Sequence, residues 1–128
     1  MIPSANNRIQ LQSFDLFRQI EKIHHKPTAS LKNIRAKYIL LHKVLEQACY
    51  ELTTHVTFSF ANLFSRLDYA CKEAKMNPSD RYAIQTMRRN CNKAMRNDFC
   101  PDIEEYLYDL RALVRFISLG FKEDIPAS

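Results

Sequence analysis

A single glycine, Gly120, in 128 residues is the feature that most restricts how this chain folds. Tight β-hairpin turns and β-bulges rely on glycine, because it adopts positive φ without steric cost. With one glycine and five prolines, the chain lacks the turn residues that a fold of many short strands requires. The same shortage excludes a glycine-rich phosphate loop. We therefore expect an all-α protein.

Five segments carry apolar residues at the three- and four-residue spacing of an amphipathic helix. They cover approximately residues 7–24, 31–52, 60–74, 80–96 and 101–120. Ser59 is the predicted N-cap of the third helix, and Ser79 or Asp80 that of the fourth. Pro101 suits the first turn of the fifth helix, and Gly120 suits its C-terminal cap.

The length and the helical pattern predict one domain over residues 1–128, built as a compact bundle of about five helices. Residues 121–128 have the composition of a linker that leaves the bundle. Such a bundle is compatible with an N-terminal or accessory module of a longer protein.

The second helix carries the most regular apolar pattern, which admits two arrangements. Steps of three and four residues connect its main apolar positions, Leu31, Ile34, Tyr38, Leu41, Leu45, Ala48 and Leu52. A heptad-like seam of this length can pair with a second chain. Ile39, Leu40 and Val44 widen the apolar arc, so we favour packing against several helices of the same chain.

Positive charge dominates the first three quarters of the chain, whose net charge is +5 overall. Residues 1–96 carry sixteen Lys or Arg against seven Asp or Glu, whereas residues 97–128 carry three against seven. Four basic residues and no acid lie in the stretch RRNCNKAMR (88–96). Helical periodicity turns Cys91, Ala94 and Met95 of this stretch towards the core and its basic residues outward.

The basic side chains of the fourth helix share one arc of roughly 140° with a tyrosine and two amides. The predicted binding face consists of Arg81, Tyr82, Gln85, Arg88, Arg89, Asn92, Lys93 and Arg96. Guanidinium groups bind phosphates and an aromatic ring stacks on bases, so this face suits sequence-tolerant nucleic-acid binding. The alternatives are a merely solvated face and a surface that meets an acidic protein.

The third helix, the turn MNPSD (76–80) and the fourth helix also suggest a helix-turn-helix DNA-binding unit. Arg81 and Gln85 would then lie near the end of the reading helix that meets base edges. The turn has no glycine and Asp80 would face the phosphates, so we rank specific DNA reading below phosphate-backbone binding.

No residue pattern predicts catalysis, a cofactor or a metal centre. The sequence contains no HExxH, GxSxG or CxxC. Glu104, Glu105 and Asp109 are interpreted as the acidic first turns of a helix. We expect the four cysteines to be reduced thiols, because the sequence shows no secretory signal.

His42 lies in the middle of the second helix, in the run LLHKVLEQ (40–47). A helical bundle with an exposed mid-helix histidine resembles the histidine phosphotransfer domains in fold, which implies a phosphate-accepting imidazole. Those domains leave room for the docking receiver with a small residue after the histidine, where this chain has Val44 and Leu45. In size, charge and helicity the chain also resembles helical accessory modules that precede motor cores in large nucleic-acid enzymes.

No stretch of eighteen uninterrupted apolar residues occurs, so we expect a cytoplasmic protein that does not enter a membrane. We interpret the chain as a non-catalytic accessory or interaction domain of a nucleic-acid-handling protein or complex, which binds the phosphate backbone through the basic face. The alternative is a protein-interaction module without nucleic-acid contact, which uses the basic face or the seam of the second helix. The sequence leaves the oligomeric state open.

Overall fold

A computed structural model gives the fold of residues 5–26, 31–96 and 101–122, with side chains described in these ranges except for residues 5–12 and 31. Within these ranges the chain forms five α-helices and no strand. The helices are α1 (Ala5–His24), α2 (Leu31–Leu52), α3 (Leu63–Glu73), α4 (Pro78–Met95) and α5 (Ile103–Gly120). The predicted all-α bundle is confirmed.

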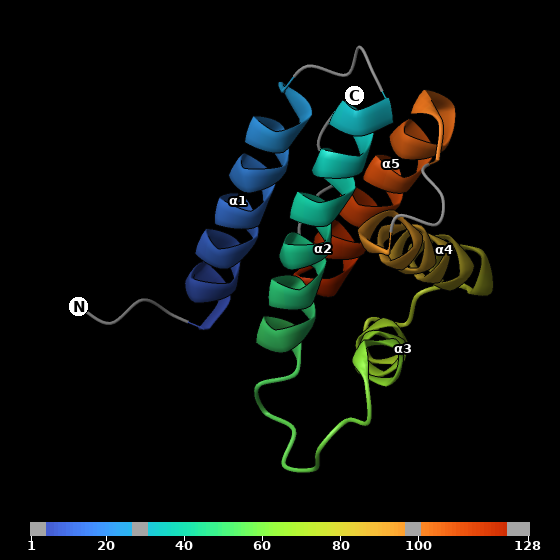
Figure 1. Ribbon diagram of the computed structural model, residues 1–128. Coiled ribbons are helices and arrows are strands. Elements are labelled where there is room, and N and C mark those ends of the chain that lie inside the picture. The colour runs from blue at the N-terminus through green and yellow to red at the C-terminus, as the bar shows by residue number, and fades with distance from the viewer. Residues whose placement is uncertain (1–4, 27–30, 97–100, 123–128) are drawn as a thin grey trace.

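Helices α1, α2 and α5 lie side by side, and α3 and α4 cross them (Figure 1). α1 runs antiparallel to α2 and α5, which run parallel to each other. This direction of α5 is possible because α3 and α4 return the chain to the end of the bundle at which α2 begins. α4 packs on both α2 and α5, and α3 packs beside α4. One side of α4 is therefore turned away from the core, with α3 next to it.

α2 is the central helix of the bundle. Six apolar positions of its seam and wider arc are buried: Ile34, Tyr38, Leu41, Val44, Leu45 and Ala48. Residues of the four other helices complete the same core. Burying one large apolar side chain contributes about 1.5 to 3 kcal/mol. The predicted packing within the chain is confirmed for the five buried seam positions, from Ile34 to Ala48, which are therefore not available to a second chain.

The N-cap of α3 differs from the predicted one. Asn62 caps the helix, and its Oδ1 accepts a hydrogen bond from Ser65 N at 2.9 Å. Residues 53–62 form an irregular connection, so Ser59 lies before the helix rather than at its start. The prediction of Ser59 as a cap was wrong because a second good capping residue followed it.

The N-termini of α4 and α5 each lie next to a proline and differ from the predicted ones. Asn77 Oδ1 accepts a hydrogen bond from Asp80 N at 2.8 Å, and Pro78 occupies the first turn. Proline fits this position because its fixed φ is helical and no N–H is needed there. The predicted caps Ser79 and Asp80 are thus inside α4. In α5 the N-cap is Asp102, whose Oδ1 accepts from Glu105 N at 2.9 Å. Pro101 therefore precedes the helix, and the prediction that it lies in the first turn was wrong.

Gly120 is the last residue of α5 rather than its cap, which is Phe121. The positive φ at this helix end belongs to Lys122, at 58°. A Cβ at position 120 would lie 2.7 Å from Leu52 Cδ1, so the glycine permits the C-terminal ends of α2 and α5 to meet. Phe121, the first residue of the predicted linker, is buried, and residues 123–128 lie outside the described ranges.

Asp109 is buried where α2, α4 and α5 meet, so its interpretation as part of an acidic helix start with Glu104 and Glu105 was wrong. Its Oδ2 accepts hydrogen bonds from the Tyr38 hydroxyl at 2.6 Å and from Asn90 Nδ2 at 2.8 Å. Burial raises the pKa of Asp109, and the two hydrogen bonds oppose that rise. The three side chains fix the three helices against one another. Glu104 and Glu105 remain exposed in the first turn of α5.

Cys49, Cys71 and Cys91 are buried free thiols, which confirms the prediction for these three. Burial raises the pKa of all three thiols, that of Cys71 to about 12, so the reactive thiolate is suppressed. Cys100 lies outside the described residues.

Candidate nucleic-acid interface

The predicted binding face of α4 divides into two parts. Arg81, Gln85 and Arg88 are half-buried and lie on the side next to α3. Asn92 is half-buried as well, whereas Tyr82, Arg89, Lys93 and Arg96 are exposed. The eight residues therefore lie on one face of α4, but that face meets two environments, α3 on one side and solvent on the other.

Gln85 connects α4 to α3. Its Nε2 donates to the carbonyl oxygen of Phe64 at 3.2 Å, and its Oε1 accepts from Arg88 Nε at 2.7 Å. Arg81 lies near Cys71 of α3. Its positive charge lowers the pKa of that thiol, although burial raises the pKa by more. Both predicted base-reading positions of a helix-turn-helix thus lie against the neighbouring helix. The Gln85 amide is therefore committed to contacts within the protein.

Two arginines of α4 lie over aromatic rings. Arg88 Cζ is 5.4 Å from the ring centroid of Phe64, and Arg89 Cζ is 5.8 Å from that of Tyr82. Phe64 is 50% exposed and Tyr82 is 68% exposed, so each ring also presents surface to solvent. Burial lowers the pKa of Arg88, and the adjacent charge of Arg89 lowers it further. The two arginines form a concentrated positive charge beside accessible rings.

Met95 belongs to the surface of α4 and not to its core. Its side chain is 40% exposed, whereas Cys91 and Ala94 are fully buried. Met95 lies at the edge of the apolar arc in the last helical turn, where the packing that buries Cys91 ends. The prediction that it turns inward was wrong for this reason.

Acidic residues of α5 do not neutralise this surface in the part of the chain that the structure describes. The ion pair between the two helices has the opposite polarity, with Asp80 Oδ1 of α4 2.9 Å from Arg115 Nε of α5. Among the described residues, no carboxylate forms an ion pair with Arg88 or Arg89. Among the described residues, Arg88 contacts the Gln85 amide and the Phe64 ring, and Arg89 contacts the Tyr82 ring.

A third arginine with aromatic neighbours was not predicted from the sequence. Arg66 Cζ of α3 lies 4.8 Å from the ring centroid of Phe60 and 5.6 Å from that of Tyr50 on α2. Its Nη1 donates to Thr53 Oγ1 at 2.9 Å. Among the described residues it too has no ion-paired carboxylate. Arg66, Arg88 and Arg89 thus share one chemistry, and we call them the ring-stacked arginines of α3 and α4. On α1, Arg18 lies over the Phe14 ring in the same way, at 5.9 Å.

The aromatic stretch FSFANLF (58–64) is the sequence feature that could have indicated aromatic neighbours for Arg66. Its three phenylalanines do not share one helical face, so a single helix cannot bury them together. In the fold, Phe58 and Phe60 pack edge to face with each other at 5.1 Å and with Tyr69 at 5.6 and 5.5 Å. Phe58 remains 56% exposed. The stretch therefore marks a surface aromatic cluster.

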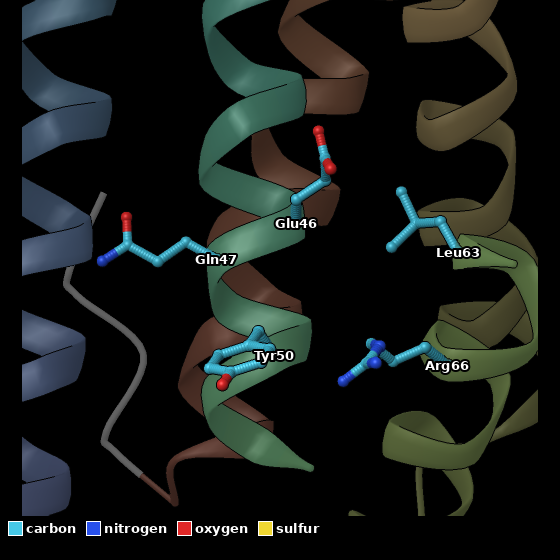
Figure 2. A pocket seen from close by; sticks show the side chains of 5 residues that line it. All are labelled: Glu46, Gln47, Tyr50, Leu63 and Arg66. Atoms are coloured by element: carbon cyan, nitrogen blue, oxygen red, sulfur yellow. The ribbon is translucent and has the colours of Figure 1, made fainter. Parts of the chain in front are cut away.

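An open pocket of about 450 Å³ lies between α2 and α3. Its lining residues are Glu46, Gln47 and Tyr50 of α2 and Leu63 and Arg66 of α3. Figure 2 shows Arg66 reaching from α3 towards the Tyr50 ring, whereas Gln47 extends to the other side of α2. Leu63 directly precedes Phe64, the residue under Arg88, so the pocket adjoins the basic surface of α4.

His42 lies next to this pocket and is not an exposed imidazole. Its side chain is 13% exposed, and Nδ1 lies 2.7 Å from Glu46 Oε1. The expected exposure of His42 was wrong, because the side chain is directed along α2 towards the glutamate one turn later. The accessible histidine implied by the resemblance to phosphotransfer domains is absent at this position.

No protein-family model, curated protein or solved structure matches the chain. Among the described residues, no three His, Cys, Asp or Glu side chains are grouped so as to hold a metal ion. Within the same ranges, no helix has the length and apolar character needed to cross a membrane.

Proposed function

We propose that this protein is a non-catalytic accessory domain that binds nucleic acid through the basic surface of α4 and the adjoining turn of α3. The observation that carries the proposal is the pairing of Arg88 with Phe64 and of Arg89 with Tyr82, without carboxylate partners among the described residues. Guanidinium N–H groups donate to phosphate oxygens, and exposed rings stack on bases. Lys93 and Arg96 extend the positive surface along α4.

The combination of charges and rings favours nucleic acid over an acidic protein. A carboxylate-rich partner would satisfy Arg88 and Arg89 but would leave the exposed Phe64 and Tyr82 rings in contact with polar groups. A polynucleotide offers anionic phosphates and flat apolar bases at a regular spacing, which matches both components. Because Arg81 and Gln85 are directed at α3, we expect binding with little sequence preference on α4.

Titration of fluorescently labelled oligonucleotides at two salt concentrations tests the proposal. We expect the double variant Arg88→Glu plus Arg89→Glu to lose at least about tenfold in affinity, because two phosphate contacts become repulsive. The salt dependence of log K should fall by about 0.7 per lost contact for a single strand. Lys22→Glu plus Arg111→Glu is the matched control, since it changes the net charge equally on α1 and α5.

Two results would contradict the proposal. One is the absence of binding by the unaltered protein at low salt. The other is an equal loss of affinity in both double variants, which would attribute binding to net charge rather than to the surface of α4.

A protein-interaction module is the second candidate function, and a separate observation favours it. Ile103 and Leu107 lie one turn apart on α5 and are 41% and 39% exposed. Contact through such apolar residues would depend little on salt, whereas phosphate binding weakens steeply as salt rises. Leu107→Gln should leave oligonucleotide affinity unchanged if the α4 surface alone binds nucleic acid.

A further inference from the structure

We infer that the pocket between α2 and α3 is a nucleobase site, which takes one unpaired base, preferably guanine, from the strand whose phosphates meet Arg88 and Arg89. The inference rests on the proposed function, which supplies the strand, and it adds to that function a ligand class for residues outside the predicted face. Three features of the pocket carry it: an aromatic wall, two unlike polar edges and its position beside α4.

Tyr50 provides the stacking wall. Its ring is 63% exposed, yet it is held in place by the Arg66 guanidinium, 5.6 Å from its centroid. Arg66 is itself fixed by the Phe60 ring at 4.8 Å and by its hydrogen bond to Thr53 at 2.9 Å. A ring that is positioned but not covered can stack on a base without first losing side-chain freedom. Leu63 adds an apolar contact on the α3 side.

Glu46 and Arg66 provide opposite polar edges. Both line the pocket, and they do not form an ion pair with each other. His42 contacts Glu46 Oε1, so Oε2 remains able to accept hydrogen bonds. Arg66 commits one N–H to Thr53 and has further N–H groups to donate. A ligand that donates along one edge and accepts along another satisfies both groups.

Guanine fits this pair of edges best among the bases. It carries N–H donors at N1 and N2 for a carboxylate, and acceptors at O6 and N7 for a guanidinium. Adenine and cytosine each offer an amino donor, and uracil offers only one ring N–H. We therefore expect guanine to bind most tightly and uracil least. A base paired in a duplex cannot present these edges inside the pocket, so the strand must be single.

The place of the pocket connects it to the α4 surface. Leu63 lines the pocket, the next residue, Phe64, lies under Arg88, and Arg88 adjoins Arg89. These contacts form a continuous path around the first turn of α3. A strand with one base against Tyr50 can therefore place its following phosphates at the two arginines of α4.

The test uses the full chain and labelled eight-nucleotide RNAs: oligouridine, the same strand with one central guanosine, and the same strand with an abasic site there. We expect the guanosine strand to bind tightest and the abasic strand weakest. Tyr50→Ala should weaken binding of the guanosine strand by about 5- to 100-fold, as expected for loss of one stacked base. Tyr108→Ala is the matched control, because Tyr108 is 60% exposed on α5.

Glu46→Gln tests the base preference separately from stacking. We expect it to reduce the preference for guanosine over uridine while leaving the affinity for oligouridine unchanged. Glu46 is exposed, so the substitution should not disturb folding. A preference that is identical in the unaltered protein and in Glu46→Gln would overturn the assignment of guanine.

The nucleobase site is overturned if the abasic strand binds as tightly as the guanosine strand, if Tyr50→Ala matches Tyr108→Ala, or if a duplex binds as tightly as the single strand. In these cases the Arg88 and Arg89 double variant still reports on the α4 surface, so the proposed function survives independently.

If no oligonucleotide binds, the proposed function fails. The pocket is then tested with guanosine and uridine 5′-monophosphates by amide NMR, where shifts around Tyr50 and Arg66 with the guanosine nucleotide support it and their absence overturns it.

Discussion

Two tyrosines of α2 occupy opposite environments three helical turns apart. Tyr38 is fully buried, and its hydroxyl donates to Asp109, which also accepts from Asn90. Tyr50 is 63% exposed, and its ring faces Arg66. The first side chain has its polar partner inside the protein. The second is held by a cation whose own charge has no carboxylate partner among the described residues.

The difference separates groups that hold the fold together from groups that remain able to bind. A buried hydroxyl must have its hydrogen bond satisfied internally, so the partners of Tyr38 are fixed by folding. A guanidinium over a ring keeps most of its N–H groups accessible, so Arg66, Arg88 and Arg89 can still donate to a ligand. Substitutions in the two regions should therefore affect different measurements.

The largest expected effect is on stability, at Asp109. Asp109→Ala removes the shared acceptor of Tyr38 and Asn90 and leaves two buried donors without partners, which should cost about 3 to 5 kcal/mol. Urea denaturation followed by circular dichroism measures this loss. Glu104→Ala on the exposed face of the same helix should change the free energy of unfolding by less than about 0.5 kcal/mol. Equal effects of the two substitutions would contradict a structural role for the buried cluster.

A matched pair of hydroxyl deletions gives the next largest effect. Tyr38→Phe removes one buried hydrogen bond to Asp109 and should lower the free energy of unfolding by about 1 to 2 kcal/mol. Tyr50→Phe removes an exposed hydroxyl and should leave stability unchanged, while the ring still stacks on a base. Comparing their urea midpoints checks the contrast directly, and a larger loss for Tyr50→Phe would reverse it.

The exposed arginines of α4 should be replaceable without loss of stability. Arg89→Gln removes the charge that contributes to lowering the pKa of Arg88, so relief of repulsion should offset the lost ring contact. We expect a change of less than about 0.5 kcal/mol in the free energy of unfolding, together with weaker oligonucleotide binding. A clear loss of stability would show that the arginine serves the fold.

The smallest expected effect is a dependence of stability on pH, caused by His24 at the end of the bundle where α1 meets α2 and α5. Burial, followed by the charges of Lys37 and His25, lowers the pKa of His24 from its ordinary value of 6.5. The unfolded chain therefore takes up a proton first, so stability is complete above pH 6.5 and falls as the pH decreases below it. Between pH 7.5 and pH 5, His24→Gln should lose less stability than the unaltered protein. His25→Gln should lose nearly as much as the unaltered protein. Parallel pH curves for the unaltered protein and His24→Gln would contradict the prediction.

Periodicity in the sequence predicted the five helices and the burial of the α2 seam, because both depend on spacing within one helix. It also placed the eight residues of the α4 face on the side away from the core. What it did not predict is which neighbour lies over each edge of that face. Arg81 and Gln85 lie against α3 because of where that helix packs, and Met95 is exposed because α4 ends there.

Contacts between helices account for the other differences. Asp109 resembles a surface acid in an acidic helix until Tyr38 and Asn90, from two other helices, are placed beside it. The pocket requires Tyr50 and Arg66 to face each other, although they belong to different helices joined by an irregular segment. No spacing rule within a single helix contains this information.

The single glycine limits which substitutions the fold can accept at position 120 and at its neighbour, position 52. Since a Cβ at position 120 meets only the flexible end of Leu52, tolerance there should be graded by side-chain volume and not by polarity. Alanine and serine should be accepted to a similar degree, whereas valine and leucine should be rejected unless residue 52 becomes smaller. Positions 52 and 120 should therefore vary together in any library selected for folding.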